Sequence, residues 1–133
     1  MPRIFIGDDF EFQNGIIFPY QPVSVDFTIT STSGLNSGQS YAIGVDTKTP
    51  LAITITLPLG NTTDALSAKV LGRVYYIFDI GNNASIKNIT INANNNGTIE
   101  GNNTLTLNGN GNSITIICIG LGNEGQGGVW KII

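Results

Sequence analysis

The sequence predicts an all-β fold, an antiparallel β-sandwich of the jelly-roll type that assembles as a trimer. Eight short segments have the composition of strands, and five of them alternate apolar and polar residues with the period of two that a half-buried strand requires. Loops rich in Asn, Gly and Ser separate these segments, and only one stretch of the chain has a plausible helical pattern. A chain of 133 residues is long enough to form one domain with its own core.

The predicted strands share a high content of Ile, Val, Thr and aromatic residues, which fit a pleated and half-buried surface. They cover residues 26–30, 40–45, 51–58, 72–80, 87–93, 103–107, 113–119 and 128–133. Residues 62–71 form either a short helix, capped by Thr63 or Asp64, or a loop. The Asn-Gly pairs within 108–111 tolerate the positive φ of a tight turn, so we expect the strands on either side to be antiparallel neighbours.

Residues 1–24 are predicted to form an extended arm, and residues 25–133 the head domain. Proline fixes φ and lacks an N–H, so the prolines of the arm suit it poorly to an interior strand. Its aromatic side chains need a surface to bury against, and they are Phe5, Phe10, Phe12, Phe18 and Tyr20. Two interpretations are open: the arm lies over its own domain, or it docks on a partner chain or a neighbouring subunit. We predict the second, with these aromatic residues in an attachment arm.

Three predicted strands are apolar on both faces, and they cover residues 72–80, 113–119 and 128–133. A sheet in a lone sandwich normally leaves one face to solvent, and a chain without helices has little material for a second cover. Each buried Ile contributes roughly 1.5–3 kcal/mol, so several solvent-exposed ones are costly. We therefore predict a subunit interface on these strands, with contacts from Val74, Tyr76, Phe78, Ile117, Ile119, Trp130 and Ile132.

Composition argues against several function classes. The chain has no histidine, which excludes Ser-His-Asp sites, Cys-His sites and imidazole-bound zinc. Six Lys and Arg residues are spread singly along a chain of net charge −3, so there is no basic patch for nucleic acid. The one cysteine, Cys118, lies in an apolar run and is expected to be a buried, inert thiol. No apolar stretch reaches the length of a membrane span, and no secretion signal is recognisable.

The acidic residues are scattered and mostly flank turns, so we predict no catalytic pair, no metal site, no cofactor and no enzymatic activity. A calcium site at Gly7–Asp9 or at Asp79 is the weaker alternative, because neither stretch has the spacing of a known calcium loop.

The order of several short blocks resembles a trimeric fibre-head domain of the kind found in phage tail fibres and in capsid-associated proteins of large DNA viruses. These blocks are VDT (45–47), AITITLP (52–58), GRVYYIFDI (72–80), NITI (88–91), GTIEG (97–101), SITI (113–116) and VWKII (129–133). Glu100 stands where that pattern has Asp, and the loop 59–71 is longer than expected. The resemblance covers residues 26–133. It implies a virion structural protein (a minor capsid, spike or fibre-head component) with itself and other capsid or fibre proteins as partners, and a host-surface glycan as a further one.

A polysaccharide-binding or polysaccharide-active β module is the alternative function. Tyr and Trp side chains stack on sugars, and the Asn- and Thr-rich residues 88–111 also resemble rungs of a parallel β-helix. Fewer than three rungs of even length can be drawn from the sequence, which favours the sandwich.

Overall fold

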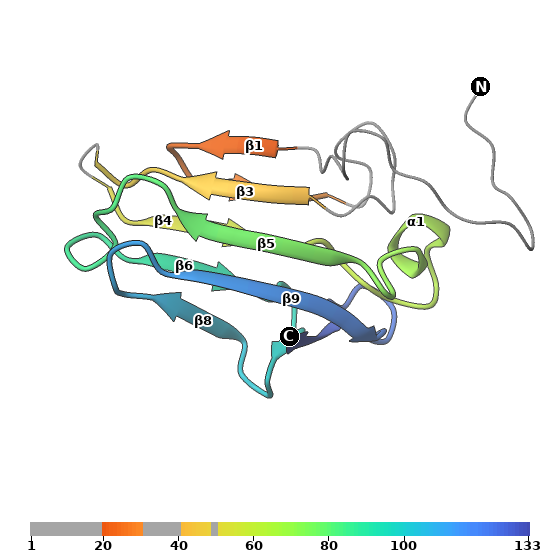
Figure 1. Ribbon diagram of the computed structural model, residues 1–133. Helices are drawn as coiled ribbons and strands as arrows, with labels where there is room; N and C mark the ends of the chain where they lie inside the picture. Colours follow the sequence, from red (N-terminus) through yellow and green to blue (C-terminus); the bar gives the residue numbers. More distant parts are fainter. Residues whose placement is uncertain (1–19, 31–40, 49–50) are drawn as a thin grey trace, which may run out of the picture.

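Two β-sheets face each other in the structure, a computed structural model that describes residues 20–30, 41–48 and 51–133. The larger sheet has the strand order β1-β3-β5-β9-β10-β7, and the smaller sheet the order β2-β4-β6-β8 (Figure 1). The elements are β1 (Tyr20–Val23), β2 (Phe27–Thr28), β3 (Tyr41–Val45), β4 (Ile53–Thr56), α1 (Ala65–Ala68), β5 (Val74–Asp79), β6 (Ile89–Asn92), β7 (Thr98–Ile99), β8 (Thr104–Leu107), β9 (Ser113–Gly120) and β10 (Val129–Ile132). The predicted all-β class is confirmed, and each of the eight predicted segments contains a strand.

The chain alternates between the two sheets, so that successive strands stack as coils. Strands β1, β3 and β5 pair in parallel in the larger sheet, while β2, β4 and β6 pair in parallel in the smaller one. Three coils therefore lie on one another, β1 with β2, β3 with β4, and β5 with β6, as in a short β-solenoid. The purely antiparallel pairing that the sequence predicted is wrong here, because five of the eight strand pairs in the described residues are parallel.

The last third of the chain closes the stack with antiparallel strands. Strand β8 pairs with β6 in the smaller sheet, and β9 pairs with β5 and β10 in the larger one. The predicted pairing of residues 103–107 with 113–119 is therefore wrong. The Asn-Gly stretch between them carries the chain from one sheet to the other, with Gly111 at φ 73°, and forms a corner instead of a hairpin.

Asparagine supplies the left-handed backbone of several other turns. Asn94, Asn95 and Asn96 follow β6 with φ angles of 67°, 31° and 64°. The short polar side chain of Asn tolerates this region better than most others. The Asn94 side chain also donates to the carbonyl of Leu57 at 3.0 Å, which joins this turn to the preceding coil.

Strand β1 brings part of the predicted arm into the domain. It is an edge strand of the larger sheet, a position that tolerates Pro22 because an edge strand has a neighbour on one side only. The body therefore begins by Tyr20 instead of at residue 25.

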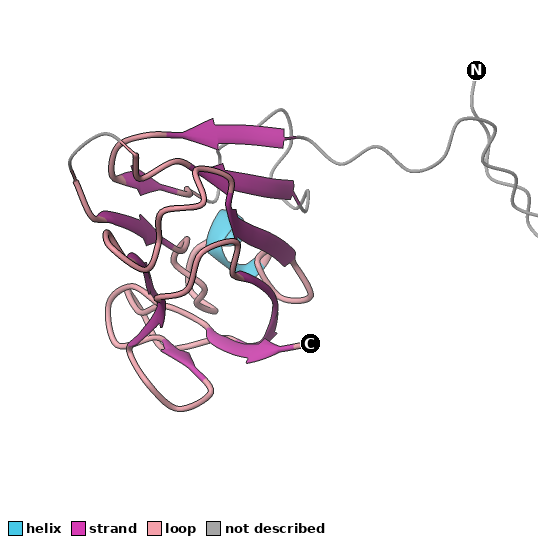
Figure 2. Ribbon diagram, turned by 60° about the vertical axis from the view of Figure 1, so that its left-hand side comes forward, coloured by secondary structure: helices cyan, strands magenta, loops and turns pink. Residues whose placement is uncertain are grey.

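The predicted helix is α1, one turn long, with Asp64 as its N-cap, and it lies at one end of the space between the sheets (Figure 2).

The core is the apolar layer between the two sheets. Alternate residues of every coil point into it, so Ile43, Ile55, Ile77 and Ile91 are fully buried. The largest members are Tyr75 and Trp130, whose ring centroids lie 5.6 Å apart. Cys118 is 1% exposed, which confirms the predicted buried thiol.

Asp79 holds the loops at the end of the sandwich opposite α1. Its buried Oδ2 accepts hydrogen bonds from the backbone N–H groups of Asn83 and Ala84 at 3.0 Å and of Gly111 at 3.1 Å. Its own N–H donates to the carbonyl of Asn112 at 2.9 Å. One carboxylate thus connects the end of β5, the loop after it and the corner between β8 and β9.

Replacement of this carboxylate tests its structural role. Asp79→Ala leaves the buried N–H of Ala84 and the partly buried N–H groups of Asn83 and Gly111 without their acceptor, and it is expected to lower the free energy of unfolding by roughly 3 kcal/mol. Asp64→Ala, which removes the α1 cap, is the matched control and should cost about 1 kcal/mol. Urea unfolding measures both losses, and equal losses would mean that Asp79 contributes no more than an ordinary cap.

Candidate functional site

The outer side of the larger sheet is the candidate site, because apolar side chains cover it where solvent would be expected. Strand β5 points Val74, Tyr76 and Phe78 outward while its other residues enter the core. Ile117 and Ile119 point outward from the neighbouring strand β9. We call this set, together with Tyr20 of β1, the apolar face. Exposed large apolar side chains gathered on one surface are typical of interaction sites.

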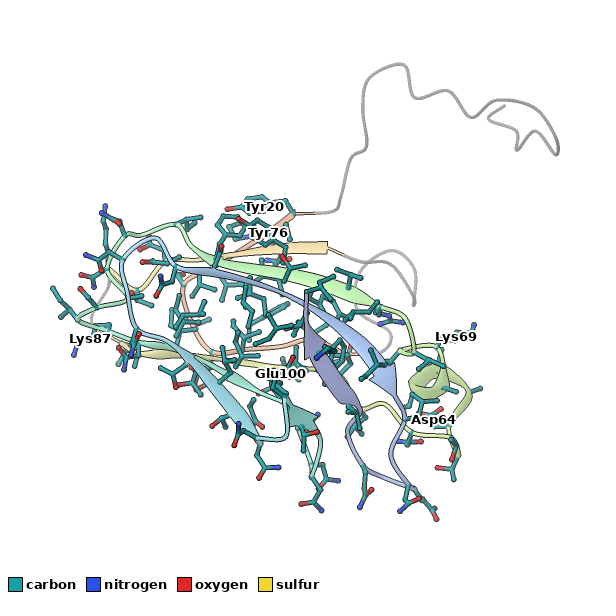
Figure 3. The ribbon with its side chains drawn as sticks, turned by 60° about the horizontal axis from the view of Figure 1, so that its bottom comes forward. Tyr20, Asp64, Lys69, Tyr76, Lys87 and Glu100 are labelled. Atoms are coloured by element: carbon teal, nitrogen blue, oxygen red, sulfur yellow. The ribbon has the colours of Figure 1, made fainter. Side chains whose placement is uncertain are left out.

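Three aromatic rings form a row across the apolar face. Tyr20 stacks on Phe78 with centroids 6.1 Å apart, and Phe78 stacks on Tyr76 at 4.8 Å. The register places Tyr20 and Tyr76 in line with each other across β3, and Figure 3 shows them together on this side. Tyr20 and Tyr76 are 52% and 43% exposed, so the rings are open to a partner.

A glycine in β3 makes room for the first ring of this row. A Cβ placed on Gly44 would lie within 2.9 Å of Tyr20 Cε1 and of Ile80 Cγ2, so only glycine fits beneath the tyrosine. Gly44 is paired with Pro22 and with Phe78 in the neighbouring strands. The close approach lets Tyr20 lie flat against the sheet.

The two outer surfaces of the molecule have opposite character. Among the described residues, no outward position of β1, β3, β5 or β9 carries a charge. The smaller sheet instead points rows of hydroxyl groups outward, a surface that we call the threonine face. Its rows are Thr54–Thr90–Thr106 and Thr28–Thr56–Asn92–Thr104. Hydroxyl and amide side chains hydrogen-bond to water, so the threonine face needs no cover and the apolar face does.

The structure brings five of the predicted interface residues together on the apolar face: Val74, Tyr76, Phe78, Ile117 and Ile119. Trp130 lies in the core instead, 1% exposed, because its strand position pairs with the inward residue Cys118. Ile132 pairs with the inward residue Ile116 and is 40% exposed near the end of the chain, on the opposite side of the sheet from the apolar face. Trp130 is therefore not available to a partner.

Of the predicted attachment residues, Phe5, Phe10, Phe12 and Phe18 lie outside the described residues. Tyr20 belongs to the apolar face. The sequence analysis missed this role because it assigned the proline-containing stretch to the arm. The signals that indicate it are the same parity of Tyr20 and Pro22, opposite to that of the buried Val23, and a strand glycine at position 44.

A charged pair borders the apolar face at β10. Glu100 accepts a hydrogen bond from the Ile132 N–H at 2.9 Å, and its Oε1 lies 3.4 Å from Lys131 Nζ. These contacts, the backbone hydrogen bond first, lower the pKa of the Glu100 carboxyl below its ordinary value. Glu100 therefore fastens the last strand to the turn after β7.

Other chemical groups are sparse in the described part of the chain. There, no three side chains of Cys, Asp or Glu gather closely enough to hold a metal ion. Burial raises the pKa of the Cys118 thiol, and its Sγ donates a hydrogen bond to the carbonyl of Gly120 at 3.2 Å. No helix among the described residues is long and apolar enough to cross a membrane.

No protein-family model matches the chain, and a search of curated proteins found no match either. The resemblance to trimeric fibre heads accordingly stays a prediction.

The Glu100 contact predicts a pH dependence. A carboxyl group with a lowered pKa in the folded state adds stability above its unfolded pKa, and this stability is lost as the pH falls through the folded pKa. The melting temperature of the native chain should therefore exceed that of Glu100→Gln at pH 6 by a few degrees, and the difference should shrink as the pH is lowered below the ordinary pKa of a glutamate. Thermal unfolding followed by circular dichroism checks this, and a pH-independent difference would contradict it.

Proposed function

We propose that this chain is a virion structural protein, a spike, fibre-head or minor capsid component that assembles as a homotrimer through its apolar face. The observation that carries the proposal is the contrast between the two outer surfaces, one covered by aromatic and aliphatic side chains and the other by threonine. A protein that works alone has no need of this asymmetry, whereas a subunit buries one surface and exposes the other.

Self-association fits the apolar face better than a small ligand does. The side chains from Tyr20 to Ile119 span four adjoining strands, β1, β3, β5 and β9, without a charge among their outward positions, which removes the largest desolvation cost of an interface. Obligate interfaces commonly bury over about 2,000 Å² in total, more than most soluble ligands cover. The threefold symmetry and the place in a virus particle are supported by the fibre-head resemblance, and residues 1–19 are the proposed attachment to other particle proteins.

A charge placed on the apolar face should separate the subunits. Tyr76→Arg puts a guanidinium in the centre of the proposed interface and is expected to weaken self-association at least tenfold, since an unpaired buried charge is strongly unfavourable. Thr90→Arg is the matched control, because it makes the same kind of change on an outward position of the threonine face. Sedimentation velocity at micromolar concentration measures both. A native chain that sediments as a monomer, or a Tyr76→Arg variant that assembles normally, would contradict the proposal.

Polysaccharide binding is the second candidate, favoured by the aromatic row of Tyr20, Phe78 and Tyr76. Stacked rings on an open sheet offer flat apolar surfaces to the C–H face of a sugar. The two functions separate at the ends of the apolar face. Ile119→Arg, far from the aromatic row, should disrupt assembly but spare glycan binding. Tyr20→Ala, at the edge of the apolar face, should abolish glycan binding and weaken assembly far less than Tyr76→Arg does. Retention of a polysaccharide on an affinity gel measures glycan binding.

A further inference from the structure

An asparagine followed by glycine carries its own reactive pair, because the backbone nitrogen of the glycine can attack the amide carbon of the asparagine. Glycine has no Cβ to hinder this approach. In the described part of the chain the sequence occurs at positions 96, 108 and 110, and each time in different surroundings. The reaction requires that the glycine N–H and the asparagine amide are free to meet, so the hydrogen bonds of these groups decide which position reacts.

Hydrogen bonds hold the glycine nitrogen at two of the three positions. The Gly97 N–H is buried and donates to the carbonyl of Asn94 at 2.7 Å. The Gly111 N–H donates to Oδ2 of the Asp79 carboxylate at 3.1 Å. Either nitrogen must give up its acceptor before it can attack, and a charged acceptor such as Asp79 makes the bond stronger.

The amide of Asn110 is held as well. Its Oδ1 accepts a hydrogen bond from the Ser85 N–H at 2.9 Å, which directs the side chain toward the loop after β5. Both reacting groups of this pair are therefore engaged with other parts of the fold.

Asn108 has neither restraint. To the described residues, no hydrogen bond runs from the Gly109 N–H or from the Asn108 amide. Asn108 is exposed and Gly109 is half-buried, so both are open to water. The carbonyl of Gly109 accepts from the Asn112 N–H at 3.0 Å, a bond that closes the turn and leaves the Gly109 nitrogen unengaged.

We propose that Asn108 is a site of spontaneous deamidation. The Gly109 nitrogen forms a bond to Cγ of Asn108, the Cγ–Nδ2 bond breaks, and ammonia leaves with the proton from the Gly109 N–H. Water then opens the resulting five-membered imide at either of its two carbonyls. The products are an aspartate and an isoaspartate at position 108, both ionised at neutral pH.

The position of Asn108 determines what the modification changes. Asn108 directly follows β8 and continues the outward parity of Thr104 and Thr106, so the new carboxylate belongs to the threonine face. The isoaspartate also adds a main-chain carbon to the corner between β8 and β9. The apolar face lies on the other sheet, so this inference goes beyond the proposed function and does not rest on it.

Incubation of the native full chain in mildly alkaline buffer tests the proposal without any substitution. Tandem mass spectrometry of a tryptic digest follows the three pairs in one peptide, 88–131, whereas the Asn-Gly pair at position 14, outside the described residues, falls in another peptide. Asn108 should lose its amide about tenfold faster than Asn96 or Asn110, since each of these must first lose a hydrogen bond. Equal rates at Asn108 and Asn110 would overturn the proposal.

The same incubation in urea separates the effect of the fold from that of the local sequence. Asn108 and Asn110 are both followed by Gly-Asn, so their rates should become similar once the chain is unfolded. If Asn108 stayed faster by the same factor in urea, the sequence and not the structure would select it, and the proposal would be wrong.

Two substitutions at exposed positions complete the test. Asn108→Ser should remove most of the mass gain of peptide 88–131, and Asn110→Ser, the matched control two residues away, should leave it almost unchanged. The opposite order of the two effects would contradict the assignment to Asn108.

Discussion

Parallel pairing between successive coils determines most of this structure. Because β1, β3 and β5 stack in register, residues of the same parity line up across the sheet, and the strands β2, β4 and β6 repeat this in the opposite layer. Each row of side chains across a sheet therefore lies either entirely in the core or entirely on the outer surface of that sheet. The arrangement buries isoleucines from every coil in one core layer. It also places every second residue of each strand on the outside, where these side chains form one continuous surface on each sheet. Which residues occupy these alternate positions decides whether that outer surface is apolar or polar.

The consequence is a molecule with two unlike surfaces. Along β4, β6 and β8 the outward parity holds threonine and asparagine, whereas along β5 and β9 it holds aromatic and aliphatic residues. One layer between two sheets accommodates one apolar face from each of them, so the second apolar set of β5 and β9 has no place in a single copy of the chain. Assembly through this set is the simplest physical use of that surplus, and the threonine face then remains for water.

Polar side chains connect the coils where apolar packing ends. The Asp79 carboxylate accepts hydrogen bonds from backbone N–H groups of two loops, and the Asn94 side chain donates to the carbonyl of Leu57 in the preceding coil. The Glu100 carboxylate accepts from the Ile132 N–H in the last strand. Arg73 differs from all three because two of its three guanidinium nitrogens, Nε and Nη2, have no hydrogen-bond acceptor among the described residues. The chain has few charged residues, so these few groups carry most of its charged interactions. A charged side chain inside the domain has a specific hydrogen-bond partner or requires one.

Local pattern determined which segments are strands, that β5 and β9 are apolar on both sides and that Cys118 is buried, because these depend on residue type and a period of two. It left residues 62–71 open between a loop and a helix capped by Thr63 or Asp64, and the structure decided for a helix with Asp64 as its cap. Tertiary structure alone decided the pairing partners and their direction, since alternation reads the same in parallel and antiparallel sheets. It also decided that Trp130 faces the core, as a register shift beside Val129 sets its side, and that Tyr20 lies on Gly44, a contact between strands that are distant in sequence.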